Sequence, residues 1–142
     1  MKKLIWCCSF LIFSHFCGFC QTAIDSLLQI TQSEKPTKEK ANAFYYLADH
    51  YIYKDTPKTI KFAKQGLELT KDCDCAKTEF HLLNVLGWAA AEVNEWEETI
   101  EAANSILKGV EIGRFKTASA KSDAYRILGY VYFRKLDYEK CL

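Results

Sequence analysis

Apolar residues recur every three or four positions from about residue 22 to the end of the chain, which is the spacing of one face of an α-helix. No stretch of useful length alternates apolar and polar residues as a half-buried strand does. The pattern therefore predicts an all-α fold. The expected helices span about residues 22–32, 38–53, 56–70, 76–92, 95–109 and 118–134, and the opening of one more follows at 137–142.

Polar residues and a glycine mark several of the expected helix ends. Thr56 is expected to cap the helix over 56–70, with Pro57 in its first turn, where a missing backbone N–H costs nothing. Asn94 and Glu97 have the three-residue spacing of a capping box at the start of a later helix. Gly109 offers that helix a C-terminal stop.

Three of the expected helices share a motif in which Leu is followed by a small residue and, three positions later, by a further apolar residue. The motif occurs as Leu47-Ala48 with Tyr51, as Leu86-Gly87 with Ala90 and as Leu128-Gly129 with Tyr132. Successive copies are 39 and 42 residues apart, and each is followed by the start of an amphipathic helix. The sequence therefore predicts a repeated pair of helices.

The repeat resembles the tetratricopeptide repeat, a helix–turn–helix unit of 34 residues. The resemblance is best in LGWAAAEVNEWEETIEAANSIL and LGYVYFRKLDYEKCL, and it implies a solenoid of αα-hairpins with about two and a half repeats. The units are expected at 38–75, 76–116 and, incomplete, 117–142, after a short amphipathic helix and linker at 21–37. The sequence departs from the family where Thr59 and Thr99 replace Ala, where Gly66 and Ile106 replace another Ala, and where the closing Pro is missing.

The last unit is expected to lack most of its second helix. A short turn is predicted at 135–136, and Asp137 is placed to cap a partner helix that lasts only to Leu142. Such a unit leaves Leu128 and Tyr132 without a covering helix, so we expect a marginally stable or self-associating chain. We also expect the chain to be a fragment of a longer protein or to take a partner for its last helix pair.

The residues expected to face inward are the apolar or small ones at helical spacing in each segment. They are Ile24, Leu27, Leu28, Phe44, Leu47, Ala48, Tyr51, Ile60, Ala63, Leu67, Phe80, Leu83, Leu86, Gly87, Ala90, Trp96, Ile100, Ala103, Leu107, Tyr125, Leu128, Gly129 and Tyr132.

Residues 1–20 have the layout of a secretory signal peptide. Lys2 and Lys3 precede a short apolar run, and the small residues Gly18 and Cys20 stand before a cut at Gln21. An uncleaved anchor needs about twenty apolar residues. Lipidation, on Cys20 or Cys17, remains a third alternative, although a bulky Phe precedes either cysteine. An exported, periplasmic or extracytoplasmic protein is therefore expected, attached to a membrane if it is part of a longer sensor.

The charge of the chain does not indicate binding to nucleic acid. Lys2 and Lys3 are two of the 19 basic residues, so the rest of the chain holds 17 against 18 acidic residues, with the signs interspersed. After residue 20 the longest candidate for a membrane span is 85–93, which is too short. We therefore expect the mature segment neither to bind nucleic acid nor to span a membrane.

Few residues could carry chemistry. Cys73 and Cys75 lie near His81 and could bind a soft metal ion, but zinc sites space their cysteines two to four apart and need a fourth ligand. The alternative, which we favour, is a loop whose cysteines are free or paired after export. His50 and His81 fall within expected helices, and no phosphate loop or nucleophile elbow occurs. We expect no enzyme, no metal and no cofactor.

The resemblance implies a ligand-binding face on the first helix of each pair, at positions that recur on one side of a helix. Aromatic rings, amides and charged groups interleave there, and Trp, Tyr and Arg dominate binding hot spots. The alternative is that several of the aromatic residues pack between repeats. The groove residues are Asn42, Tyr45, Asp49, Tyr53, His81, Asn84, Trp88, Glu92, Asp123, Arg126, Tyr130 and Arg134, with Ile52 and Phe133 beside them.

The expected function is to bind a protein or peptide without catalysis. In its sharper form, the chain resembles the exported N-terminal sensor region of histidine kinases and related regulators of Bacteroidetes-type bacteria. One alternative is a self-contained periplasmic or lipoprotein scaffold for an envelope complex. Another is a small thiol or metal protein that uses Cys73, Cys75 and Cys141.

Overall fold

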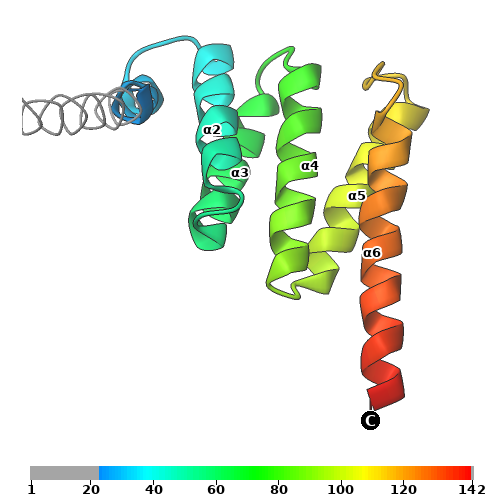
Figure 1. Ribbon diagram of the computed structural model, residues 1–142. Helices are drawn as coiled ribbons and strands as arrows, with labels where there is room; N and C mark the ends of the chain where they lie inside the picture. Colours follow the sequence, from blue (N-terminus) through cyan, green and yellow to red (C-terminus); the bar gives the residue numbers. More distant parts are fainter. Residues whose placement is uncertain (1–22, 142) are drawn as a thin grey trace, which may run out of the picture.

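The computed structural model describes residues 23–141, with side chains up to residue 135. Within that part the chain forms six α-helices, which confirms the all-α prediction (Figure 1). Residues 23–32 form the first. The others are α2 (Thr37–Tyr51), α3 (Thr56–Thr70), α4 (Ala76–Glu92), α5 (Trp96–Glu111) and α6 (Ala120–Cys141). The predicted signal peptide at 1–20 lies outside the described residues.

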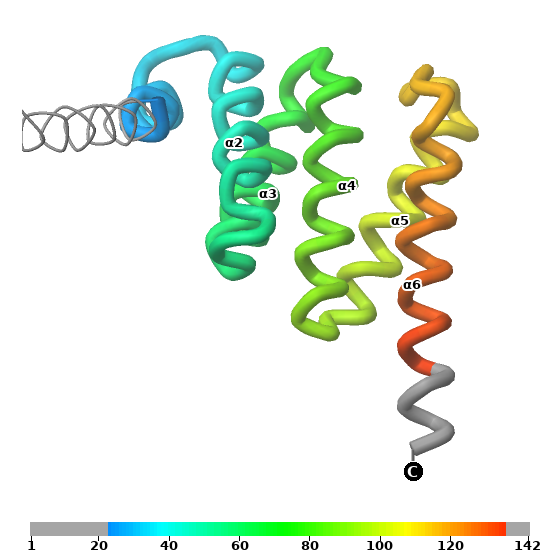
Figure 2. Tube along the Cα trace, viewed as in Figure 1, coloured from blue at the N-terminus to red at the C-terminus, as the bar shows by residue number. Residues whose placement is uncertain are grey.

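From α2 to α6, each helix packs antiparallel against the next one along the chain. Figure 2 shows the chain passing from α2 to α6 in this order without returning to its start. Helices α2, α4 and α6 stand side by side in Figure 1, while α3 and α5 lie behind them. The even-numbered helices therefore form one continuous face. None of the helices in the described part is long and apolar enough to cross a bilayer.

Two apolar clusters make up the core, and α4 belongs to both. The first joins α2, α3 and α4 through Ala48, Ala63 and Leu82. The second joins α4, α5 and α6 through Phe80, Ile106 and Ile127, and it includes Phe115 from the loop before α6. Because α4 lies between two helix pairs, it buries ten residues, including all five that the sequence predicted for it.

The predicted starts of α3 and α5 lie within one residue of the observed ones, but their predicted caps are wrong. Asp55, not Thr56, caps α3, because its Oδ1 accepts a hydrogen bond from the Lys58 N–H at 3.1 Å. Pro57 does lie in the first turn. The capping box predicted from Asn94 and Glu97 is wrong. Helix α5 begins after Glu95 without a side-chain cap, and Asn94 instead makes the tight turn, with φ of 61°.

Gly109 does not end α5, which continues to Glu111. The left-handed residue lies later, at Gly113, where φ is 72°. Gly109 has a packing role instead: a Cβ at this position would overlap the buried ring of Phe115. The missing side chain therefore lets the loop after α5 fold back onto the helix.

The predicted turn at 135–136 and the helix start at Asp137 are wrong, because α6 is one helix as far as Cys141. Its predicted buried face is right only for Leu128, which is half-buried against the second cluster. Tyr125 and Tyr132 are 55% and 60% exposed, and a Cβ at Gly129 would meet nothing within 4 Å. The physical reason is that α6 touches α4 and α5 on its other side. That side buries Ala120, Ala124, Ile127 and Val131.

Thr59 and Thr99 occupy matching positions in α3 and α5, and both are fully buried. Each hydroxyl donates to the carbonyl four residues earlier, at 3.2 Å in α3 and 2.9 Å in α5. A buried hydroxyl that is bonded within its own helix needs no partner across the core. Threonine is therefore accommodated at these positions.

Candidate functional site

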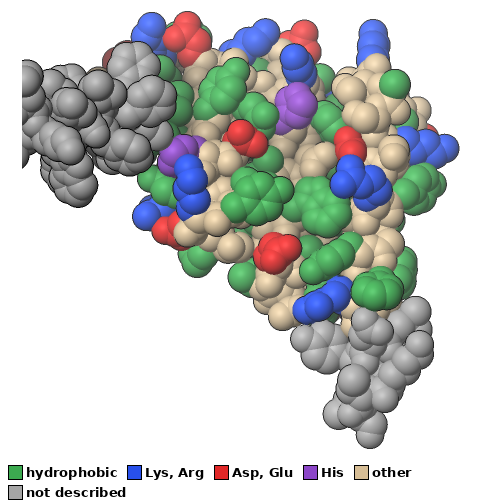
Figure 3. All heavy atoms as spheres, viewed as in Figure 1, with side chains coloured by type: hydrophobic (Ala, Val, Ile, Leu, Met, Phe, Trp, Pro, Cys, Tyr) green, Lys and Arg blue, Asp and Glu red, His purple; other side chains and the backbone are tan. Residues whose placement is uncertain are grey.

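The predicted groove residues lie on the α2–α4–α6 face, which we define as the surface that these three helices share. Figure 3 shows this face, where apolar, basic, acidic and histidine side chains are interspersed over the front of the molecule. Eleven of the twelve residues belong to α2, α4 and α6. The exception is Tyr53, which follows the end of α2 and is 92% exposed.

Between α2 and α4 the face is held together by two contacts. The rings of Tyr45 and His81 stack with centroids 5.2 Å apart. The Thr78 hydroxyl donates to Oδ1 of Asn42 at 2.5 Å, which fixes the orientation of that amide. Three predicted residues, Asn42 and Tyr45 of α2 and His81 of α4, are therefore brought together.

Between α4 and α6 the contacts are aromatic and cationic. The rings of Trp88 and Tyr130 meet edge to face at 5.8 Å. Arg126 lies over the Trp88 ring at 5.6 Å from its centroid, and Arg134 lies 6.0 Å from that of Tyr130. Arg126 also pairs with Asp123 at 3.3 Å. These contacts agree with the alternative that the aromatic residues pack between repeats. The side chain of Arg126 nevertheless stays 66% exposed.

The other predicted residues of α2 and α4 are Asp49, Asn84 and Glu92. Asp49 and Glu92 are exposed, and Asn84 is half-buried in the middle of α4. They supply charged and amide groups between the aromatic contacts.

A pocket of about 420 Å³ opens on this face between the N-terminal halves of α2 and α4. Its walls include the predicted residues Asn42, Tyr45 and His81. The other lining residues are not predicted from the sequence, because no periodic pattern shows which residues at a helix start meet those of the neighbouring pair. The missed residues are Lys38, Tyr46, Asp74, Cys75, Ala76, Lys77 and Thr78.

Burial shifts the pKa values of two titratable side chains in the pocket, His81 and Tyr45. The pKa of His81 lies below its usual 6.5, first because the ring is partly buried and second because Lys77 is near, while Asp49 and Asp123 act in the opposite direction. Burial also raises the pKa of Tyr45, helped by Asp49 and Tyr46. At neutral pH the pocket therefore presents an uncharged imidazole and an uncharged phenol.

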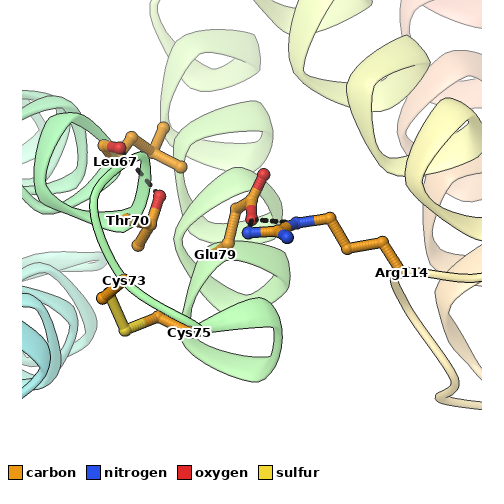
Figure 4. Close-up of polar contacts among 6 residues, drawn as sticks. All are labelled: Leu67, Thr70, Cys73, Cys75, Glu79 and Arg114. Atoms are coloured by element: carbon orange, nitrogen blue, oxygen red, sulfur yellow. Dashed lines mark hydrogen bonds and ion pairs between the residues drawn. A yellow bond between two sulfur atoms is a disulfide. The ribbon is translucent and has the colours of Figure 1, made fainter.

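Cys73 and Cys75 form a disulfide in the loop between α3 and α4, which was one of the two states expected for them (Figure 4). In the described part no group of three or more His, Cys, Asp or Glu residues is arranged to hold a metal ion. Beside the disulfide, Nε of Arg114 donates to the carboxylate of Glu79 at 2.6 Å. This pair ties the loop after α5 to the first turn of α4 (Figure 4).

Comparison with known proteins adds no relative: no protein-family model, no curated protein and no solved structure matches the chain. The fold itself defines the class, an all-helical domain of sequentially packed antiparallel helices.

Proposed function

We propose that the chain is a tetratricopeptide-like module that binds an extended peptide or protein segment on the α2–α4–α6 face. Its role is binding rather than catalysis. The observation that carries the proposal is the pocket of about 420 Å³, because three residues chosen from the sequence as groove residues line it. The pocket lies among exposed rings, amides and charges that suit both the backbone and the side chains of a peptide.

Equivalent contacts in successive helix pairs support the repeat. Positions 40 residues apart in α3 and α5 play the same part: Thr59 and Thr99 are buried and bonded alike, and Ala63 and Ala103 are both fully buried. Gly87 acts as the Leu-Gly motif of the family implies. A Cβ there would lie 3.0 Å from the Ile127 side chain, so the missing side chain lets α6 approach α4 closely.

Export and signalling complete the proposal. A disulfide suits an oxidising compartment outside the cytosol, which supports an extracytoplasmic location. The sharper form, in which the chain is the sensory part of a longer signalling protein, is supported by the resemblance of its sequence to such regions. The genomic reading frame beyond Leu142 tests it: an apolar span and an output domain are expected there, and a stop codon directly after Leu142 contradicts it.

The binding face is tested with a displayed library of random dodecapeptides selected on the purified chain. Binders are expected to lose affinity about 10-fold or more when Asn84→Ala and Arg126→Ala are combined, because these changes remove polar groups from the face without opening the core. Fluorescence anisotropy of the selected peptides gives the Kd.

The matched control combines Asn104→Ala with Lys108→Ala on the outward surface of α5. Circular dichroism checks that both double variants keep their helix content. The proposal is overturned if no selected peptide distinguishes the α2–α4–α6 variant from the α5 variant.

A further inference from the structure

The Cys73–Cys75 disulfide lies beside the proposed binding face, because Cys75 is one of the residues that line the pocket, but the bridge is not needed to hold distant elements together. Its cysteines are two residues apart, with Cα atoms 5.3 Å from each other, so the bridge closes only a single tight turn. The Cys75 N–H already donates to the Cys73 carbonyl within that turn at 2.9 Å. A bridge over so few residues restricts the unfolded chain little compared with one that closes a long loop. A purely structural role therefore explains it poorly.

The two sulfur atoms differ in environment. Cys73 lies in the loop and is half-buried, whereas Cys75 is 3% exposed and is the residue that directly precedes α4. Figure 4 shows the bridge at this junction, with the Cys75 side at the first turn of the helix. An incoming thiol therefore reaches the Cys73 sulfur more readily than the Cys75 sulfur.

The start of α4 favours negative charge on Cys75. The first N–H groups of a helix lack intrahelical partners and carry a partial positive charge. Cys75 stands at the N-cap of α4, and no side chain caps this helix while the sulfur is held in the bridge. A thiolate released there can accept from these N–H groups as a capping carboxylate does, which lowers the pKa of a cysteine at such a position.

Neighbouring side chains act in opposite directions. Asp74, between the two cysteines, disfavours a thiolate, and Lys77 in the first turn favours it. Both side chains are exposed, so water screens their charges, whereas the N–H groups at the start of α4 are held in place next to Cys75 by the helix itself. The charges of Asp74 and Lys77 also oppose each other, which leaves the start of α4 as the feature that favours a thiolate at Cys75.

We propose that Cys73-Asp74-Cys75 is a thiol–disulfide exchange site. A thiolate attacks the Cys73 sulfur, forms a mixed disulfide with it and releases Cys75 as a thiolate at the start of α4. A second thiol of the substrate then attacks the substrate sulfur of the mixed disulfide and releases the Cys73 thiolate. Two substrate thiols become one disulfide, and the two electrons reduce the Cys73–Cys75 bridge. The substrate class is a thiol, borne by a small molecule or by a cysteine-containing peptide.

The first experiment follows the redox state of the bridge in the full chain. Trypsin cuts after Lys71 and Lys77, so both cysteines fall on the peptide 72–77 and are separated from the other five. The chain is incubated with reduced glutathione at about 10 mM or with a dodecapeptide that carries two cysteines, then alkylated, digested and weighed. The bridge is expected to be reduced, with glutathione disulfide or the oxidised peptide as product.

Two variants test the direction of attack. Cys75→Ser leaves Cys73 without a resolving partner and is expected to collect a mixed disulfide with oxidised glutathione at residue 73. Cys73→Ser is the matched control. Its buried Cys75 is expected to react with oxidised glutathione at least about 10-fold more slowly than Cys73 does in the Cys75→Ser variant. Circular dichroism confirms that both variants keep their helices.

Equal rates in the two variants, or a faster reaction at Cys75, overturn the proposal. So does a wild-type bridge that neither thiol reduces. If only glutathione reduces the bridge, the substrate is a small thiol; if only the peptide does, it is a cysteine on a polypeptide. The reaction with glutathione and the comparison of the two cysteine variants require no peptide on the α2–α4–α6 face, although Cys75 lines the pocket there, so the two proposals fail separately.

Discussion

Two glycines in similar helical surroundings have opposite roles. Gly109 faces the buried Phe115 ring, which a Cβ would overlap, whereas a Cβ on Gly129 would meet nothing within 4 Å. Replacing Gly by Ala in a helix gains about 1 kcal/mol where space allows, and overpacking a core costs about 1–3 kcal/mol. We therefore expect Gly109→Ala to lower the free energy of unfolding and Gly129→Ala to raise it, by up to about 1 kcal/mol.

Urea unfolding followed by circular dichroism measures both changes. The two variants control for each other, because each makes the same substitution inside a helix. Equal shifts of the same sign are the result that contradicts this account of Gly109. The sequence marked Gly109 as special but assigned it to a helix end, because its partner, Phe115, lies in a loop whose path no periodic pattern describes.

The histidine in the pocket makes stability depend on pH. Because the pKa of folded His81 lies below its usual 6.5, both the folded and unfolded chains hold a neutral ring above that pH, and the ring contributes nothing there. Below about pH 6.5 the unfolded chain takes up a proton before the folded chain does, so stability declines until the folded pKa is also passed.

We expect His81→Asn to make the loss of stability between pH 7.5 and about 5.5 shallower than in the wild type. Urea midpoints at the two pH values provide the measurement. His50→Asn controls for the loss of a histidine as such, since His50 lies at the end of α2 outside the pocket lining. An unchanged pH slope in His81→Asn would show that burial of this ring does not disfavour its charged form.

The start of α3 depends on one side chain. Asp55 accepts from the Lys58 N–H, and its second oxygen pairs with Nζ of Lys58 at 2.8 Å. Both contacts hold the pKa of the Asp55 carboxyl below its usual value. The stability that it supplies is present above its usual pKa near 3.8 and is lost as the pH falls through its lower value in the folded chain.

Asp55→Ala is therefore expected to lower the Tm at neutral pH, whereas Asp55→Asn keeps a capping oxygen and should lose less. Differential scanning calorimetry at pH 7 gives the order wild type, Asn, Ala. If the Ala and Asn variants melt together below the wild type, the charge pair and not the cap stabilises this end of the helix.

Periodicity predicted the helices well and their faces less well. For α4, both sides are covered, so every residue expected inside is buried. For α6 the expected face matched the repeat motif, but only Leu128 packs against the core, while Tyr125 and Tyr132 are exposed and the space beside Gly129 is open. A repeat motif predicts which residues of a helix can be buried. Their actual burial depends on a neighbouring helix, which the sequence of the motif does not specify.

The turn expected at 135–136 shows the same limit. Residues in this stretch match the start of a second helix in the family pattern, yet they contain no Pro or Gly to end the preceding helix, and α6 continues through them. The groove is the reverse case. Its residues share one side of three helices, and a 3.6-residue period suffices to place them on one face, although not to show the pocket wall contributed by Lys38 and Lys77.

Within the part of the chain that the structure describes, α6 has an apolar surface that no other described helix covers. Tyr125, Tyr132 and Phe133 of α6 are 55%, 60% and 64% exposed, and Gly129 leaves room between them for close approach. Exposed apolar patches of this kind commonly mark interfaces. We expect two copies of the chain to pair through this side of α6, so that the sedimentation coefficient rises between micromolar and hundreds of micromolar concentration.

The double change Tyr132→Ser with Phe133→Ser is expected to keep the chain monomeric across that range. Ile112→Ser is the matched control, because Ile112 is 66% exposed but lies in the loop after α5, away from this side of α6. A wild-type chain that sediments as a monomer throughout, or an Ile112→Ser variant that dissociates as readily as the double variant, would show that α6 is not the contact. If only the α6 variant abolishes association, the partner copy covers the side of α6 that carries Tyr132 and Phe133, which no other described helix covers.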